Sequence, residues 1–149
     1  MKLTTLFILL TVLLTLSCVD DKLSPESALK NFVEARFEAV VTKNFVLERV
    51  TGKLKQGLEN TSDEEFAKFS DLRKMKKDSF KILTKSCQEK QCFITYSVAY
   101  KTNEDDKTVY TTEVKKIAEL QNIEGKWLIA DVSNVKTYVE AIEPINPLE

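Results

Sequence analysis

Three cysteines are the residues of this sequence with the clearest chemistry, and their spacing divides them into a single residue and a pair. An uncharged run of fifteen residues, 3–17, begins after Met1-Lys2 and ends directly before Cys18. Two acidic residues follow at positions 20 and 21. A basic start, an apolar run and a small residue before the cleavage point are typical of a secretory signal. Because a membrane-spanning helix needs ~20 apolar residues, we expect this run to be cleaved rather than kept as an anchor.

The residues around Cys18 resemble a bacterial lipobox, in which the cysteine at position +1 is acylated before the signal is removed. Ser17 fits the small residue at position −1, whereas Thr15 and Leu16 stand out of the usual order. The alternative is an ordinary signal peptide cut elsewhere, with Cys18 incidental. The resemblance implies a lipoprotein of the bacterial cell envelope that faces the periplasm and is held by several acyl chains. Val19 rather than Asp at position +2 favours the outer membrane over the inner membrane.

Cys87 and Cys92 form the pair, in the stretch SCQEKQC. Their spacing differs from the C-x-x-C of redox enzymes, and a chain without histidine or a second pair has too few ligands for a structural zinc site. An exported protein lies in an oxidising compartment, where neighbouring thiols can stay bonded. We therefore expect a local disulfide, and neither a metal nor a cofactor.

Polar side chains that could form an active site are few. Without histidine there is no imidazole base and no Ser-His or Cys-His nucleophile pair, and the three glycines form no phosphate-binding loop. The candidate pocket residues on expected strands are Tyr96, Tyr100, Tyr110 and Trp127, with Glu113 and Asp131 as the carboxylates. A strand tyrosine is more often a core or rim residue than a catalyst, and Trp127 suits a core anchor. The residues therefore favour a protein that is not an enzyme.

Composition sets the size and the charge of the folded part. Removing 1–17 leaves 132 of the 149 residues, with 21 basic and 23 acidic side chains and a formal charge of −2. A near-neutral chain lacks the basic face that nucleic acid requires. We expect a signal peptide over 1–17, a tether over 18–23, a single domain over 24–142 and, because of two prolines, a tail over 143–149.

The elements that would position the candidate residues begin with helices. Ser24 and Pro25 provide an N-cap and a first helical position, and apolar residues then recur at three- and four-residue spacing up to residue 41. A second helix is expected over 47–58, weakened by Gly52. A third begins at Ser62 and Glu65, which match the S-x-x-E capping box.

The second half of the chain is extended. The stretches 79–87 and 92–101 are rich in β-formers and predict a hairpin with a four-residue loop, which places Cys87 opposite Cys92. A long strand over 108–123, with a bulge near Lys115-Lys116, and a last strand over 126–135 follow. Helices followed by four antiparallel strands predict an α+β fold.

Three stretches resemble the nuclear transport factor 2-like superfamily: SPESALKNFVEARFEAVVTKNF at 24–45, the strands at 91–101 and 108–121, and EGKWLIADV at 124–132. The resemblance implies N-terminal helices packed on a strongly curved, mainly antiparallel four-stranded sheet that forms a cone. Enzymes of this superfamily use Asp, Tyr or His in the cone. No motif residue carries over, since histidine is absent and the first tyrosine is Tyr96.

These observations predict a membrane-anchored periplasmic lipoprotein with a non-catalytic binding or assembly domain. Its expected partners are the membrane, through the N-terminal lipid, and either another envelope protein or a second copy, but not nucleic acid. The alternatives are a small-molecule enzyme that uses Tyr, Asp or Glu inside the cone and a carrier of a small apolar ligand. A buried carboxylate beside a tyrosine would favour the enzyme.

Overall fold

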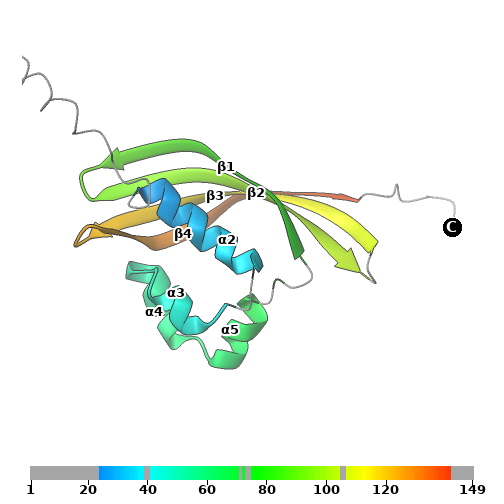
Figure 1. The fold of residues 1–149 in the computed structure, drawn as a ribbon, viewed down its shortest axis with the longest axis horizontal. Coiled ribbons are helices and arrows are strands. Elements are labelled where there is room, and N and C mark those ends of the chain that lie inside the picture. The colour runs from blue at the N-terminus through cyan, green and yellow to red at the C-terminus, as the bar shows by residue number, and fades with distance from the viewer. Residues whose placement is uncertain (1–23, 39–40, 71, 73–74, 105–106, 142–149) are drawn as a thin grey trace, which may run out of the picture.

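The protein is built on one antiparallel sheet whose four strands follow one another in space as they do in sequence (Figure 1). The computed structural model describes residues 24–38, 41–70, 72, 75–104 and 107–141. The strands are β1 (Met75–Gln88), β2 (Gln91–Glu104), β3 (Lys107–Ile123) and β4 (Lys126–Ala141). Their order is β1-β2-β3-β4, so β1 and β4 are the edges.

The turn between β1 and β2 is tighter than the sequence suggested. Gln88 pairs with Gln91, which leaves a two-residue turn in place of the expected loop of four, and Glu89 has a φ of 44°. The β3–β4 turn places Glu124 and Gly125 at φ 53° and 83°. Positive φ at both central residues matches the twist of the strands, and glycine adopts it without steric cost. The irregularity expected near Lys115-Lys116 is present, and its extra residue lies on β4.

Four helices precede the sheet among the described residues: α2 (Pro25–Glu38), α3 (Lys43–Leu47), α4 (Gly52–Asn60) and α5 (Asp63–Ser70). The predicted start of the first is confirmed, because the Ser24 hydroxyl accepts a hydrogen bond from the Ser27 N–H at 3.1 Å. This contact satisfies one of the N–H groups that a helix leaves unpaired at its first turn.

The single helix expected over 47–58 is wrong, because a turn and the extended residues Val50 and Thr51 separate α3 from α4. Val50 forms an isolated parallel bridge with Ile129 of β4, supported by Thr51 N–H to Ile129 C=O at 2.8 Å and Ile129 N–H to Arg49 C=O at 3.0 Å. Gly52 then begins α4 with a φ of 55°. The backbone of β4 thus binds a segment whose apolar spacing alone suggested continuous helix.

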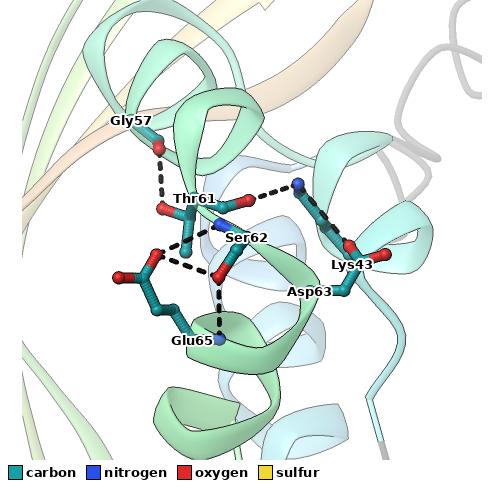
Figure 2. Close-up of polar contacts among 6 residues, drawn as sticks. All are labelled: Lys43, Gly57, Thr61, Ser62, Asp63 and Glu65. Carbon is teal, nitrogen blue, oxygen red and sulfur yellow. Dashed lines mark hydrogen bonds and ion pairs between the residues drawn. The ribbon is translucent and has the colours of Figure 1, made fainter.

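The capping box at the start of α5 is confirmed (Figure 2). The Ser62 hydroxyl accepts from the Glu65 N–H at 3.2 Å, and the Glu65 carboxylate accepts from the Ser62 N–H at 3.1 Å. Lys43 of α3 donates to the Thr61 carbonyl at 2.6 Å and lies 3.7 Å from the Asp63 carboxylate. The reciprocal bonds fix where α5 begins, and Lys43 ties the end of α4 to α3.

The core lies between the helices and the part of the sheet that they contact. α2 packs against β1 and β4, and α4 packs against β4. Side chains with almost no exposed surface come from both layers, including Leu29, Ile94, Leu120 and Ile129. Burial of apolar surface at ~25 cal/mol per Å² makes this layer the main source of stability.

The expected cone of N-terminal helices on a strongly curved sheet is wrong, although α2 and α4 do pack against the sheet. The described chain is mainly a four-stranded antiparallel sheet of long strands, 14 to 17 residues each, with α3–α5 only 5 to 9 residues long. The strands extend beyond the region covered by helices (Figure 1), and residues 133–140 of β4 are all exposed. Alternation of apolar residues predicts which face of a strand is buried, but the length over which helices cover that face depends on tertiary packing.

Candidate functional site

A cavity of about 200 Å³ lies under α2, between the helix and the middle of the sheet. Most of its wall is apolar, and four of its side chains carry polar groups: Arg36 from α2, Tyr96 and Tyr100 from β2, and Lys116 from β3. The complete lining is Val33, Arg36, Phe37, Leu72, Met75, Tyr96, Val98, Tyr100, Val114 and Lys116. An apolar hollow with a few convergent polar groups is the usual form of a small-molecule site.

The two cations reach the cavity from facing layers. Lys116 lies directly opposite Tyr96 in the β2–β3 register, and strand residues that lie opposite share a face of the sheet. Arg36 approaches from the helix above them. Among the described residues of the lining none is acidic.

Burial changes the proton affinity of Arg36, Tyr96 and Lys116. It lowers the pKa of Arg36, and it lowers the pKa of Lys116 with a further contribution from the Arg36 charge. It raises the pKa of Tyr96 to about 12, although the Arg36 charge opposes this effect. Each shift has the direction expected when a charged form loses water. The Tyr96 hydroxyl therefore stays protonated at neutral pH and can donate a hydrogen bond.

Aromatic contacts hold the tyrosines of the cavity in place. The ring of Tyr100 lies 6.0 Å from that of Phe37 on α2, and the ring of Tyr96 lies 5.6 Å from that of Phe80 on β1, both tilted. Tilted pairs at these distances are favourable geometries for aromatic rings. Tyr96 is therefore fixed between the β1 side chains and the cavity.

Two ion pairs join α2 to β1. Glu34 accepts from Lys77 at 2.5 Å, and this hydrogen bond lowers the pKa of Glu34. Glu26, nearer the start of α2, pairs with Lys85. Partly exposed pairs contribute little stability each, roughly 0.2–1 kcal/mol. Their main effect here is to hold α2 in one position on the sheet.

The structure separates the four candidate pocket residues. Tyr96 and Tyr100 line the cavity. Tyr110 does not; it is 40% exposed near the start of β3. Trp127 packs against the core cluster, as expected of an anchor. Cys18 lies outside the described residues.

The two strand carboxylates also lie away from the cavity. Glu113 is exposed and lies opposite Tyr138 in the β3–β4 register. Asp131 accepts a hydrogen bond from the Val132 N–H at 2.8 Å. No described lining residue thus places a carboxylate beside Tyr96.

The cysteine pair expected on the first hairpin is present. Cys87 and Cys92 lie opposite one another in the β1–β2 register, and their Sγ atoms are at disulfide distance, 1.98 Å apart. The Cys92 side chain is fully buried in the core cluster. The pair therefore links the edge strand β1 to the interior of the sheet.

Sequence reasoning missed Arg36 and Lys116, although the sequence carried a signal for both. Arg36 follows Leu29 by seven residues and Val33 by three, which places it on the apolar face of α2. Lys116 alternates in phase with Val114 and Ala118 on the buried face of β3. A charged residue in register with an apolar face is the pattern that could have identified them.

A broader, open hollow lies at the hairpin end of the sheet, lined by Gln88–Gln91 and Gln121–Ile123. Its walls are turns and strand ends, with few apolar groups to bury a ligand. In the part of the chain that the structure describes, no group of three potential ligand residues could hold a metal ion. No described helix is both long and apolar enough to cross a membrane.

Comparison with known proteins shows a likeness in fold. No family model matches the chain, and no curated protein matches it. The solution structure of a SEC-C motif-containing protein from Rhodopseudomonas palustris is similar, with a TM-score of 0.57 over 76% of this chain and 80% of that chain. At 9% identity the likeness concerns the fold alone.

Proposed function

We propose that the protein is a lipid-anchored protein of the bacterial cell envelope whose folded domain binds a small ligand without transforming it. The cavity under α2 is its binding site. The observation that carries this proposal is the pairing of apolar walls with Arg36, Lys116 and Tyr96 around one cavity. Such a lining suits an amphiphilic anion, with its apolar part against the walls and its negative end near the cations.

The charges of the lining favour an anion over the purely apolar ligand considered from sequence. Lys116 is partly buried near a second cation, an arrangement that disfavours its charged form. A carboxylate in the cavity would offset the repulsion and could accept a hydrogen bond from the Tyr96 hydroxyl. Charge-assisted hydrogen bonds of this kind are roughly twice as strong as neutral ones.

The size of the cavity limits the ligand. An engineered apolar cavity of about 150 Å³ binds benzene, so a cavity of about 200 Å³ has room for a single ring that carries a carboxylate, or for a short acyl chain. A larger lipid would need the helix to move. An enzyme is less well supported, because none of the described lining residues is a carboxylate that could act as the acid–base partner of a lining tyrosine.

The proposed cellular location of the protein is supported separately by its N-terminal sequence. The charged start, the uncharged run and Ser17-Cys18 match the order of a lipoprotein signal. Cys87 and Cys92 at disulfide distance fit an oxidising compartment such as the periplasm. The outer membrane remains favoured because Val19 follows the cysteine.

Benzoate and benzamide test the proposal, because they have nearly the same size and differ in charge. We expect the full-length protein to bind benzoate on the order of tenfold more tightly than benzamide, measured by calorimetry or ligand-observed NMR. Lys116→Met should remove the preference, and Tyr110→Phe, which changes a residue outside the cavity, should keep it. Equal binding of the two probes would favour an apolar carrier. Binding of neither would reject the cavity as a site for ligands of this size.

A further inference from the structure

The second half of β4 is an open sheet edge. β4 is the last strand of the sheet, and among the described residues its outer side is bridged only near its start, where Val50 pairs with Ile129. From residue 133 to 140 every side chain is exposed, with Tyr138 at 52% and Val139 at 63%. An edge strand presents unpaired N–H and C=O groups, and a long exposed one is a template for pairing with another strand.

The residues of this edge alternate between the two faces of the sheet. Lys136, Tyr138 and Glu140 share one face. The Lys136 ammonium lies 4.5 Å from the centre of the Tyr138 ring, consistent with that placement. Thr137 and Val139 lie on the other face. The segment therefore presents a cation, an aromatic ring and an anion in a row at every second residue.

We propose that this edge pairs antiparallel with the same edge of a second copy, about a two-fold axis at Tyr138. In this register Lys136 of each copy lies opposite Glu140 of the other, and Tyr138 lies opposite Tyr138. Val139 lies opposite Thr137. Directly opposed residues on antiparallel strands are ~4.5–5.5 Å apart, so both charge pairs are within reach. The two sheets would form one continuous sheet of eight strands.

Charge selects this register over its neighbours. A two-fold axis perpendicular to the sheet leaves each face of the sheet on the same side in both copies. Residues that lie opposite one another must therefore point to the same side, which requires the axis to pass through a residue and not between two residues. An axis at Lys136 would oppose two lysines, and one at Glu140 would oppose two glutamates. Within this segment only the axis at Tyr138 sets opposite charges against one another. Opposed unlike charges stabilise a strand pair, and opposed like charges destabilise it.

The charges within one copy also favour pairing with a second copy. Lys136 lies opposite Lys115 of β3, a like-charge pair on the exposed face, and no ion pair among the described residues neutralises either lysine. Glu140 of a second copy would add a carboxylate beside these two ammonium groups. The edge therefore lacks in one copy the charge that a second copy supplies.

Sedimentation equilibrium of the full-length protein in density-matched detergent tests the pairing. We expect a reversible dimer at micromolar concentrations. Lys136→Glu and Glu140→Lys each replace two attractive pairs by two repulsive ones, so each should raise the dimer dissociation constant on the order of tenfold or more. The double variant, which exchanges the two charges, should regain the wild-type constant. All these side chains are exposed, so unchanged melting curves serve as the control for folding.

Mixing the two single variants gives the sharpest outcome. A copy with Lys136→Glu has two acids at these positions and a copy with Glu140→Lys has two lysines, so only the mixed pair sets opposite charges together. A tagged Lys136→Glu chain should therefore capture an untagged Glu140→Lys chain and not another Lys136→Glu chain. A monomeric wild type would overturn the inference, as would single variants that dimerise like the wild type. The result does not depend on whether the cavity binds a ligand.

Discussion

Lys116 of β3 lies directly opposite Tyr96 of β2, and both side chains line the cavity under α2. The pair combines a cation and a hydroxyl on the buried face of a sheet. Burial lowers the pKa of one and raises the pKa of the other. Both pKa shifts have the same cause, because removing water from a group disfavours its charged form. Both shifts can be measured.

Replacing Lys116 by Met should stabilise the protein while it weakens anion binding. The change keeps a chain of similar length in the cavity and removes a charge that burial and Arg36 disfavour. We expect a gain on the order of 1 kcal/mol in the free energy of unfolding, measured by urea denaturation at neutral pH. Lys115→Met, at the neighbouring residue on the opposite face of β3, should change the stability much less. A strongly destabilised Lys116→Met would show that the ammonium has a structural partner.

Tyr96 should make the stability fall at high pH. Its pKa is about 12 in the folded protein and near 10 when unfolded, so the folded state holds the proton longer. The stability that this difference contributes is present below pH ~10 and is lost as pH rises towards 12. Tyr96→Phe should remove this part of the decline.

The measurement is a tyrosinate absorbance titration with denaturation curves at each pH. Of the four tyrosines, one should ionise late in the wild type, and that step should be missing in Tyr96→Phe. Tyr110→Phe, at a half-exposed site, serves as the control and should keep the late step. A wild type whose tyrosines all ionise together while it remains folded would contradict the burial of Tyr96.

Breaking the Cys87–Cys92 link should lower stability without changing the fold. The link closes a loop of six residues, for which the chain-entropy relation gives about 2 kcal/mol. Reductant should lower the melting temperature of the wild type by several degrees and leave Cys87→Ala/Cys92→Ala unchanged. Thiol labelling of protein taken directly from cells gives the redox state. Two freely labelled thiols in the wild type would argue against an oxidising compartment.

Cys18 should carry the lipid. The intact mass of membrane-extracted protein should correspond to a chain that begins at Cys18 and carries acyl groups, and Cys18→Ser should leave the protein unlipidated. Sucrose-gradient fractionation then distinguishes the two membranes, with the outer expected. A mature chain that begins elsewhere and has no acyl group would reject the lipoprotein assignment.

The sequence alone was enough for the local features, because their causes are local. Ser24 before Pro25, and Ser62 three residues before Glu65, carry the groups that cap their own helices, and both starts are confirmed. Two β-rich runs joined by a short connection predicted the hairpin that sets Cys87 opposite Cys92. These contacts span a few residues, or strands joined by a short turn, so the pattern of residue types specifies them.

Tertiary structure decided what depends on distant segments. Whether 47–58 formed one helix depended on the backbone of Ile129, which binds Val50 and interrupts the apolar spacing. The cone failed as a prediction because strand alternation says nothing of how far helices cover a sheet. The cavity is likewise non-local, since Arg36 and Lys116 are far apart in the chain and line one cavity only because α2 packs on the sheet. Each residue's place on a buried face could be read from the sequence, but their meeting required the packing of helix on sheet.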